Sequence, residues 1–299
     1  MDTKPLVYDA IILGGSYAGL SAGLQLARAR RRVLVIDAGT RRNRFAGTSH
    51  GFLTQDGTAP QDIAAEGRAQ LMEYGTVDWL HGDAEQVHRS AGRFDVVLPS
   101  GEVRSGRRLV LAAGVQDTLP DLPGLAERWG RHVFHCPYCH GYELQQGRIG
   151  VLATSPLSIH QALMLPDWGA TTLFLHQQPQ PSSEELEQLQ ARGVSIVTGA
   201  VACLQGETVE LAMHDGRSFA LDGLFVATRV VPSPLASRIG CELEDGPMGA
   251  FVKTDAMKAT SVPGVFACGD VARPAGSIAF AVADGAMAGM AAHRSLMFG

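Results

Sequence analysis

The sequence predicts an α/β protein with two Rossmann-like, three-layer nucleotide-binding domains, the second inserted into the first. Two strand–helix–strand patterns lead to this prediction, one near the N-terminus and one that begins at Arg148. A length of 299 residues suits two domains. We expect the first domain at 1–114 and 235–299 and the inserted domain at 115–234. The Pro-containing stretch Val230–Pro234 is expected to be a linker.

Apolar runs and helical spacing predict the elements in chain order. In the first domain they are strand Asp9–Leu13, turn Gly14–Gly19, helix Leu20–Arg30, strand Val33–Ile36, strands Phe94–Leu98, Arg108–Ala112 and Val265–Ala267, and final helix Gly276–Leu296. In the inserted domain they are strand Ile149–Ala153, helix Leu157–Leu165, strand Thr171–Leu175, helix Ser183–Arg192, and strands Val194–Val197 and Leu224–Ala227.

Composition argues against several classes of protein. A net charge of −5 and a pI of about 6.0 speak against a nucleic-acid-binding surface. No stretch is long and apolar enough to span a membrane. The N-terminal run lacks the basic start and long apolar core of a signal peptide and is interpreted as a strand. Five cysteines, an odd number, do not suggest an exported disulfide framework, and we expect a cytoplasmic protein.

The first turn indicates a dinucleotide site. It reads Gly14-Gly15-Ser16-Tyr17-Ala18-Gly19, close to the pattern Gly-x-Gly-x-x-Gly between a strand and a helix. Ser16 stands at the second glycine position, where a small side chain can still donate to phosphate. Asp37 ends the next strand, where a carboxylate can accept hydrogen bonds from ribose hydroxyls.

A second signal, near the C-terminus, points to FAD. A strand leads into Gly269-Asp270 and then into the final helix. Asp270 can hydrogen-bond the ribityl chain, and backbone N–H groups around Ile278 and Ala279 can face the flavin pyrimidine oxygen. Ala113 closes the strand before the chain leaves this domain and completes the predicted cofactor-binding set.

The hexapeptide Cys136-Pro137-Tyr138-Cys139-His140-Gly141 indicates redox chemistry, because two such thiols can close and reopen a disulfide. Three other interpretations compete. A zinc site needs about four ligands, and no second Cys pair appears, so no metal is expected. Cys-x-x-Cys-His also matches haem c attachment. In the simplest alternative, the two cysteines are packed and buried without redox chemistry. The isolated Cys203, Cys241 and Cys268 are expected to be small buried hydrophobic residues of this kind.

These motifs, in this order, resemble the low-molecular-weight thioredoxin reductase family, which has an FAD domain in two segments and an inserted NADPH domain with a Cys-x-x-Cys. The resemblance implies FAD, a homodimer, a flavin-facing Cys139 and a substrate-exchanging Cys136. His140 stands where the family has a proton-transferring Asp, and a histidine near its own pKa can take a thiol proton. His135 also flanks the pair, in a role that the sequence leaves open.

The inserted domain departs from the family pattern. The stretch Ala153-Thr154-Ser155-Pro156-Leu157-Ser158 stands where the family has Gly-x-Gly-x-x-Ala, and His176-Gln177-Gln178 stands where it has His-Arg-Arg. These differences argue against ordinary NADPH use without excluding it. With these departures the sequence resembles the dithiol oxidase branch of the family, whose members close disulfides in small products such as gliotoxin and holomycin.

We therefore expect an FAD-dependent thiol–disulfide oxidoreductase that oxidises a small dithiol through Cys136 and Cys139, with oxygen as acceptor. The alternative is a thioredoxin or disulfide reductase fed by NAD(P)H or another donor. A flavin-binding redox sensor is the alternative of another class. The substrate, a small dithiol or a thiol protein, is not given by the sequence. His50 is either a second base, part of the substrate wall, or structural.

Overall fold

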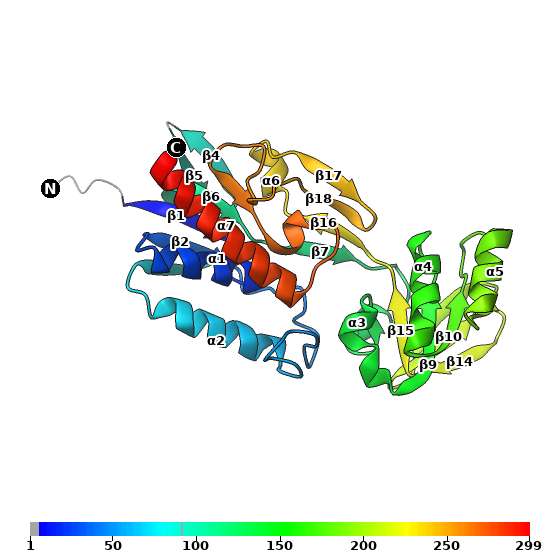
Figure 1. Ribbon diagram of the computed structural model, residues 1–299. Helices are drawn as coiled ribbons and strands as arrows, with labels where there is room; N and C mark the ends of the chain where they lie inside the picture. Colours follow the sequence, from blue (N-terminus) through cyan, green and yellow to red (C-terminus); the bar gives the residue numbers. More distant parts are fainter. Residues whose placement is uncertain (1–5, 91) are drawn as a thin grey trace. The chain divides into compact units, whose positions relative to one another are not determined.

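A computed structural model describes residues 6–90 and 92–299 (Figure 1). Residues 1–5, where the question of a signal peptide arose, lie outside the described residues. The chain forms two compact units. The first is made of Met1–Arg42, Pro60–Gln116 and Val230–Gly299, and the second of Asn43–Ala59 and Asp117–Arg229. The predicted domain boundaries stay a prediction. They placed residues 43–59 in the first domain, whereas the structure groups these residues with the second unit.

The first unit is built on a seven-stranded sheet with the order β3-β2-β1-β6-β5-β4, in which β19 also pairs with β6. Strand β6 divides its pairing: Val103–Gly106 lies antiparallel to β5, and Leu109–Leu111 lies parallel to β19. The strands are β1 Val7–Leu13, β2 Val33–Asp37, β3 Val77–His81, β4 Gln86–Ser90, β5 Arg93–Val97, β6 Val103–Leu111 and β19 Val265–Ala267. Because β1, β2, β3, β6 and β19 run parallel, their carboxyl ends meet at one edge.

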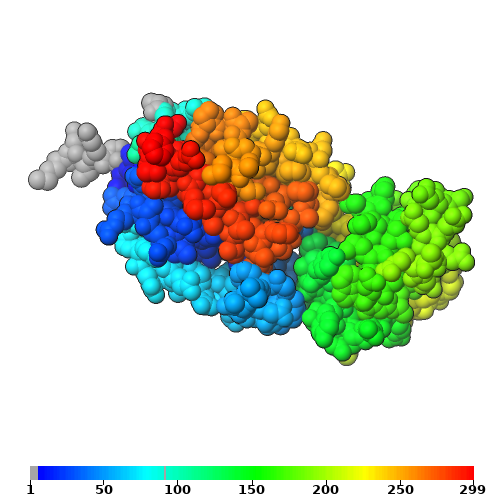
Figure 2. Space-filling model, viewed as in Figure 1, coloured from blue at the N-terminus to red at the C-terminus, as the bar shows by residue number. Residues whose placement is uncertain are grey.

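Both faces of this sheet are covered. Alternate residues of β1 belong to different apolar clusters, with Ala10 and Ile12 in one and Ile11 and Leu13 in the other. The first cluster includes residues of α1 (Tyr17–Arg28) and α7 (Ile278–Phe298). Helix α2 (Pro60–Met72) packs on α1, and α7 lies at the surface of the unit (Figure 2). The other face carries α6 (Leu235–Arg238) and the hairpin of β17 (Leu243–Gly246) and β18 (Gly249–Val252).

The second unit contains an all-parallel sheet with the order β11-β10-β9-β15-β8. One face packs on helices α4 and α5, and the other packs on the antiparallel sheet β12-β13-β14. The elements are β8 Val133–Phe134, β9 Gln146–Leu152, α4 Leu157–Met164, β10 Gly169–Phe174, α5 Ser183–Ala191, β11 Ser195–Val197, β12 Val201–Gln205, β13 Val209–Met213, β14 Ser218–Leu221 and β15 Gly223–Val226. Each unit thus has three layers, which confirms the predicted α/β class.

The predicted linker Val230–Pro234 begins where the chain passes from the second unit to the first, but most of it is a regular strand and not an irregular connection. Arg229–Pro232 forms β16, which pairs with β7 (Val115–Thr118) in a separate two-stranded sheet. Proline lacks the backbone N–H group that strand pairing uses, so the prolines in this stretch suggested an irregular segment. A two-stranded ribbon has only edge strands, and an edge strand accepts a proline at its end.

Candidate functional site: a dinucleotide turn and a redox disulfide

The turn after β1 is shaped by Gly14, which has φ +102°. A Cβ atom there would collide with the carbonyl oxygen of Ala112, so glycine is required both by conformation and by space. The next residue, Gly15, donates its N–H to Oδ1 of Asp37 at 2.9 Å. Three predicted residues, Gly14, Gly15 and Asp37, therefore meet at the carboxyl edge of the sheet, and Ala113 borders Gly14.

Helix α1 begins directly after this turn. Ser16 occupies the N-cap position in extended conformation, but its side chain makes no capping hydrogen bond. The first N–H groups of a helix have no partner within the helix, so the start of α1 favours an anion. Gly19, also predicted, packs its Cα against the carbonyl group of Gly14. The arrangement suits a pyrophosphate.

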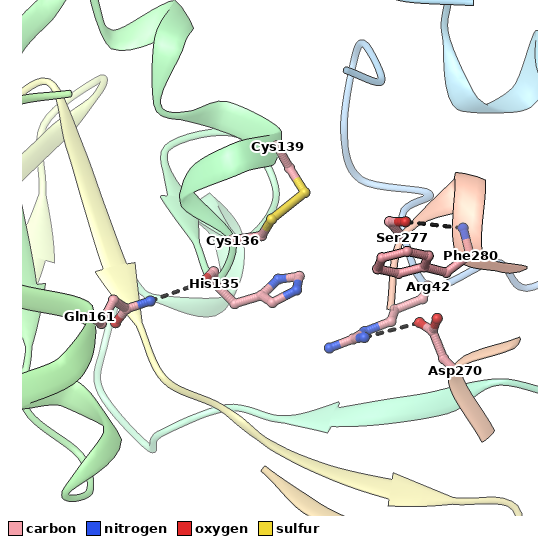
Figure 3. Close-up of a disulfide and its surroundings, with 8 residues drawn as sticks. All are labelled: Arg42, His135, Cys136, Cys139, Gln161, Asp270, Ser277 and Phe280. Carbon is pink, nitrogen blue, oxygen red and sulfur yellow. Dashed lines mark hydrogen bonds and ion pairs between the residues drawn. A yellow bond between two sulfur atoms is a disulfide. The ribbon is translucent and has the colours of Figure 1, made fainter. Parts of the chain in front are cut away.

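The Gly269-Asp270 motif lies beside the start of α1. Gly269 has φ +75°, and a Cβ on it would come within 2.8 Å of the Ala18 Cβ. Asp270 follows in a short 3-10 helix, η4 (Gly269–Ala272), and its Oδ2 accepts from Arg42 Nη1 at 3.0 Å (Figure 3). The structure therefore brings this motif to the same edge as Gly14. Arg42 is a partner that the sequence did not indicate, because nothing in the spacing connects residues 42 and 270.

Helix α7 starts with a side-chain cap. The Oγ of Ser277 accepts the N–H of Phe280 at 3.2 Å, as Figure 3 shows. The N–H of Ala281 bonds the Ser277 carbonyl oxygen. The N–H groups of Ile278 and Ala279 are left without a partner inside the helix. These two predicted residues can therefore donate to a ligand, and the positive end of the helix dipole favours negative charge there.

In the second unit, Cys136 and Cys139 form a disulfide at the start of helix α3 (Pro137–His140), with Cα atoms 5.4 Å apart (Figure 3). Cys136 is the N-cap, and Pro137 takes the first helical position, where its missing N–H costs nothing. Trp168 supports the loop: its ring meets Tyr138 edge-on at 5.3 Å and lies where a Cβ on Gly141 would collide. The pair is thus a disulfide on a braced turn.

His140 ends this helix and stacks on Phe134, with ring centroids 4.3 Å apart and planes at 16°. Both ring nitrogens are buried without a hydrogen-bond partner. Burial, and to a smaller degree the charge of His50, lower the pKa of His140 to about 4. The expectation of a histidine near its ordinary pKa is therefore wrong. The imidazole is neutral at pH 7 and can accept a proton, as a weak base.

The two other histidines of the predicted site have distinct settings. His50 Nε2 lies 3.4 Å from Oε1 of Glu143 and 3.1 Å from Oγ1 of Thr48. Its Nδ1 lies 3.6 Å from Oδ1 of Asp56. The backbone carbonyl of His135 accepts from Nε2 of Gln161 at 2.8 Å, and its ring stacks on Trp129. His50 is thus tied to carboxylates, whereas His135 is bonded through its backbone.

In the turn between β9 and α4 of the second unit, backbone N–H groups donate to a side chain of the same segment. The side chain of Ser158, which is fully buried, accepts the N–H of Thr154 at 3.0 Å and that of Ser155 at 3.4 Å. The hydroxyl of Thr154 donates to the carbonyl oxygen of Ala227 at 2.9 Å. Pro156 is the N-cap of α4 and has no N–H to give. The donors that a dinucleotide turn presents to pyrophosphate are therefore already engaged by the chain.

The strand end after β10 is also unlike a phosphate-binding cluster. His176 adopts φ +53°, and its Nδ1 accepts the N–H of Val201 at 3.0 Å. Burial, with a smaller contribution from His214, lowers its pKa. A ring nitrogen that accepts a backbone N–H is unprotonated, so His176 carries no positive charge here. Gln177 and Gln178 follow with no charge.

The three remaining cysteines lie apart from the disulfide chemistry. Cys268 is fully buried, and burial raises the pKa of its thiol to about 12. Burial also raises the pKa of Cys241, while Cys203 is half-buried on β12. Within residues 6–90 and 92–299, no three His, Cys, Asp or Glu side chains are grouped to hold a metal ion. In the same residues, no helix is both long and apolar enough to cross a membrane.

Comparison with known proteins defines the class. Residues 8–289 match the family model described as pyridine nucleotide-disulphide oxidoreductase, and the chain belongs to this family. The chain is 33% identical over 312 residues to thioredoxin reductase tcpT of Claviceps purpurea, covering 99% of this chain and 96% of that protein. These findings confirm a thioredoxin reductase-like enzyme, an oxidoreductase that acts on sulfur groups.

Two solved structures are similar over the whole chain. The oxidoreductase from Agrobacterium tumefaciens is 53% identical with a TM-score of 0.95, covering 98% of this chain and 99% of that one. The structure of HlmI is 37% identical with a TM-score of 0.92, covering 99% and 95%. The predicted fold class and the prediction of a thiol–disulfide oxidoreductase are both confirmed.

Proposed function

We propose that this chain is an FAD-dependent dithiol oxidase, in which the Cys136–Cys139 pair takes two electrons from a small dithiol and oxygen is the final acceptor. One observation carries the choice of oxidase over reductase. Ser158 engages the backbone donors of Thr154 and Ser155, where a pyridine nucleotide would place its pyrophosphate. An enzyme without a working NADPH site needs another electron source, and a dithiol substrate is one.

The first unit supports FAD as the cofactor, since its residues fit that group. The turn at Gly14–Gly19 leads into the N-terminus of α1, whose positive dipole end favours a pyrophosphate, and Asp37 ends β2 where ribose hydroxyls can donate to it. Asp270 and the N–H groups of Ile278 and Ala279 would hold the ribityl chain and the pyrimidine edge. When bound, FAD supplies a two-electron acceptor that oxygen can reoxidise.

The chain's own chemistry is disulfide exchange. One substrate thiolate attacks the Cys136 sulfur, the Cys136–Cys139 bond breaks, and Cys139 leaves as a thiolate. The second substrate thiolate then attacks the mixed disulfide, which releases the cyclic product and leaves both cysteines reduced. Neutral His140 lies one residue after Cys139, and its pKa of about 4 makes it a poor acceptor for a thiol proton, so the substrate enters as a thiolate. Per turnover, one dithiol and one oxygen give one disulfide and one hydrogen peroxide.

Anaerobic reduction tests the proposal. We expect a small dithiol such as dithiothreitol to bleach the bound flavin, and air to restore the colour with one peroxide per dithiol. NADPH at micromolar concentration should leave the flavin oxidised. The Cys136→Ser and Cys139→Ser variants should lose turnover, whereas Cys203→Ser, a half-buried cysteine on β12, should keep it. Prompt bleaching by NADPH would instead establish the reductase.

The reductase is the second candidate, because the similar thioredoxin reductase tcpT bears that name. A redox sensor, the third candidate, predicts slow cycling of the disulfide and no peroxide with any dithiol. The proposal also includes a homodimer, supported by the family resemblance. The cellular location stays a prediction from the sequence.

A further inference from the structure

Asp284, on the second turn of α7, is the one charged side chain of the described residues that is fully buried, with 3% of its surface exposed. It receives two cations. Its Oδ1 lies 2.8 Å from Lys258 Nζ and 3.0 Å from Arg273 Nη2, and its Oδ2 lies 2.5 Å from Arg273 Nε. Burial raises the pKa of Asp284, and the hydrogen bonds from Arg273 and Lys258 lower it by more, so the carboxyl stays ionised.

Such a cluster is a poor means of stabilising a fold. Desolvating the charges costs several kcal/mol per ion, roughly as much as their attraction returns, and apolar side chains of similar volume often serve stability as well. A buried ionic cluster is better suited to fixing one geometry. The elements that Asp284 joins therefore indicate what the cluster does.

Arg273 ties Asp284 to both predicted flavin contacts. It directly follows η4, which carries Asp270, and precedes the Ser277 cap of α7 by four residues. The intervening segment contains Pro274 and Gly276 and no regular element. The guanidinium group of Arg273 also lies 4.7 Å over the ring of Phe280, in the first turn of α7. One side chain thus fixes the connection at both ends.

Lys258 brings in a third element. It adopts φ +63°, a left-handed conformation that costs roughly 1 kcal/mol or more for a residue with a side chain. Oδ1 of Asp255 accepts the N–H groups of Met257 and Ala259 and holds this turn. The Lys258 carbonyl accepts the N–H of Ala267, at the end of β19. The left-handed turn at Lys258 therefore connects the end of β19, two residues before Gly269, to the Asp284 carboxylate.

We propose that Asp284 is a positioning residue for the flavin: through Lys258 and Arg273 it holds Asp270 and the N–H groups of Ile278 and Ala279 in the geometry that FAD requires. The inference rests on the proposed binding of FAD to the first unit. It assigns Asp284 no contact with FAD or substrate. It predicts that replacing the whole cluster by apolar side chains weakens FAD binding more than it weakens the fold.

The test uses the full-length purified protein and follows FAD release on dilution by flavin fluorescence, together with thermal unfolding. Asp284→Asn keeps the shape and removes the charge, and we expect the dissociation constant of FAD to rise about tenfold or more. The visible flavin spectrum of the variant should also shift, because the polar groups around the ring lose their alignment. Asp215→Asn, which breaks an exposed ion pair with Arg217 in the second unit, is the matched control and should change neither.

A triple variant separates positioning from stability and guards against an Asp284→Asn chain that does not fold. Lys258→Met, Arg273→Met and Asp284→Leu together replace the cluster by apolar side chains. We expect this chain to unfold near the wild-type temperature and still to bind FAD weakly. Wild-type FAD affinity in either the single or the triple variant would overturn the inference. A wild-type chain that binds no FAD would overturn the proposed function, and the inference with it.

Discussion

The chain has two strand–turn–helix connections of the same topology, one between β1 and α1 and one between β9 and α4. They differ in whether a side chain of the following helix accepts the backbone N–H groups of the turn. In the first, the side chain of Ser16 makes no capping hydrogen bond at the start of α1, whose N-terminus favours an anion. In the second, the Ser158 hydroxyl takes the N–H groups of Thr154 and Ser155. One hydroxyl on the chain can therefore replace the phosphate of a cofactor. A nucleotide-type fold does not by itself establish a nucleotide site.

The largest predicted effect is at the open turn. Gly14→Ala places a methyl group against the Ala112 carbonyl in a left-handed conformation, and we expect loss of bound FAD and at least about 3 kcal/mol of stability. The ratio of flavin to protein absorbance measures the bound FAD, and thermal unfolding measures the stability. Gly216→Ala, at φ +89° but in open space, is the control and should cost only about 1 kcal/mol and no FAD. Equal losses in both variants would contradict the argument from space.

The next effect concerns the buried nitrogens of His140, which no protein group satisfies. Its folded-state pKa of about 4 lies below its ordinary value of about 6.5. The unfolded chain therefore takes up a proton first as the pH falls, so stability declines between about pH 6.5 and 4 and this contribution levels off below pH 4. The full loss of stability is about 3 kcal/mol, because the pKa of His140 falls from about 6.5 to about 4 and one pKa unit is about 1.4 kcal/mol.

Denaturant unfolding at pH 7.5 and 4.5 checks this contribution. His140→Phe keeps a ring to stack on Phe134 and removes the titration, so the variant should lose less stability on acidification than the wild type. His88→Gln, at an exposed position on β4, is the control and should follow the wild type. Parallel acid profiles for the wild type and His140→Phe would show that His140 is not the titrating group.

A smaller effect is expected at the closed turn. Ser158→Ala removes the acceptor of two partly buried N–H groups and should cost about 1–3 kcal/mol. It should not create NADPH binding, because Gln177 and Gln178 provide no cation for the 2′-phosphate. Thermal unfolding and titration calorimetry with NADPH measure the two effects. Ser155→Ala keeps both hydrogen bonds and is the control. Micromolar NADPH binding by Ser158→Ala would contradict this expectation and show that the Ser158 hydroxyl alone prevents NADPH binding.

The contrast between the turns was visible in the sequence, but its cause was not. Missing glycines at Ala153 and Ser155 showed that the second turn departs from the pattern, whereas the hydrogen bonds of Ser158 depend on how α4 meets β9. Local patterns predicted β1, β2, β9, β10 and β19 because buried parallel strands are continuously apolar. The partly exposed strands β12, β13 and β14 and the grouping of residues 43–59 with the second unit were missed, since they follow from tertiary packing.

Site residues divide in the same way. Cys136, Cys139 and Gly14 were found because spacing alone marks them. Arg42, Glu143 and Asp284 were not, because each acts through a partner distant in sequence: Asp270, His50 and Lys258. In the sequence, Asp284 is only a charge that interrupts an apolar helix. No local signal distinguishes such a charge from a solvent-exposed one.

The smallest effect compares two helix caps of similar geometry. Ser277 caps α7 through the N–H of Phe280 at 3.2 Å, and Ser182 caps α5 through that of Glu185 at 3.3 Å. Either serine changed to alanine should cost about 1 kcal/mol, which thermal unfolding detects. Only Ser277→Ala should also weaken FAD binding, by a few-fold, because the first turn of α7 loses its fixed direction. FAD release on dilution measures this difference, and equal FAD affinities in the two variants would show that the start of α7 does not hold the cofactor.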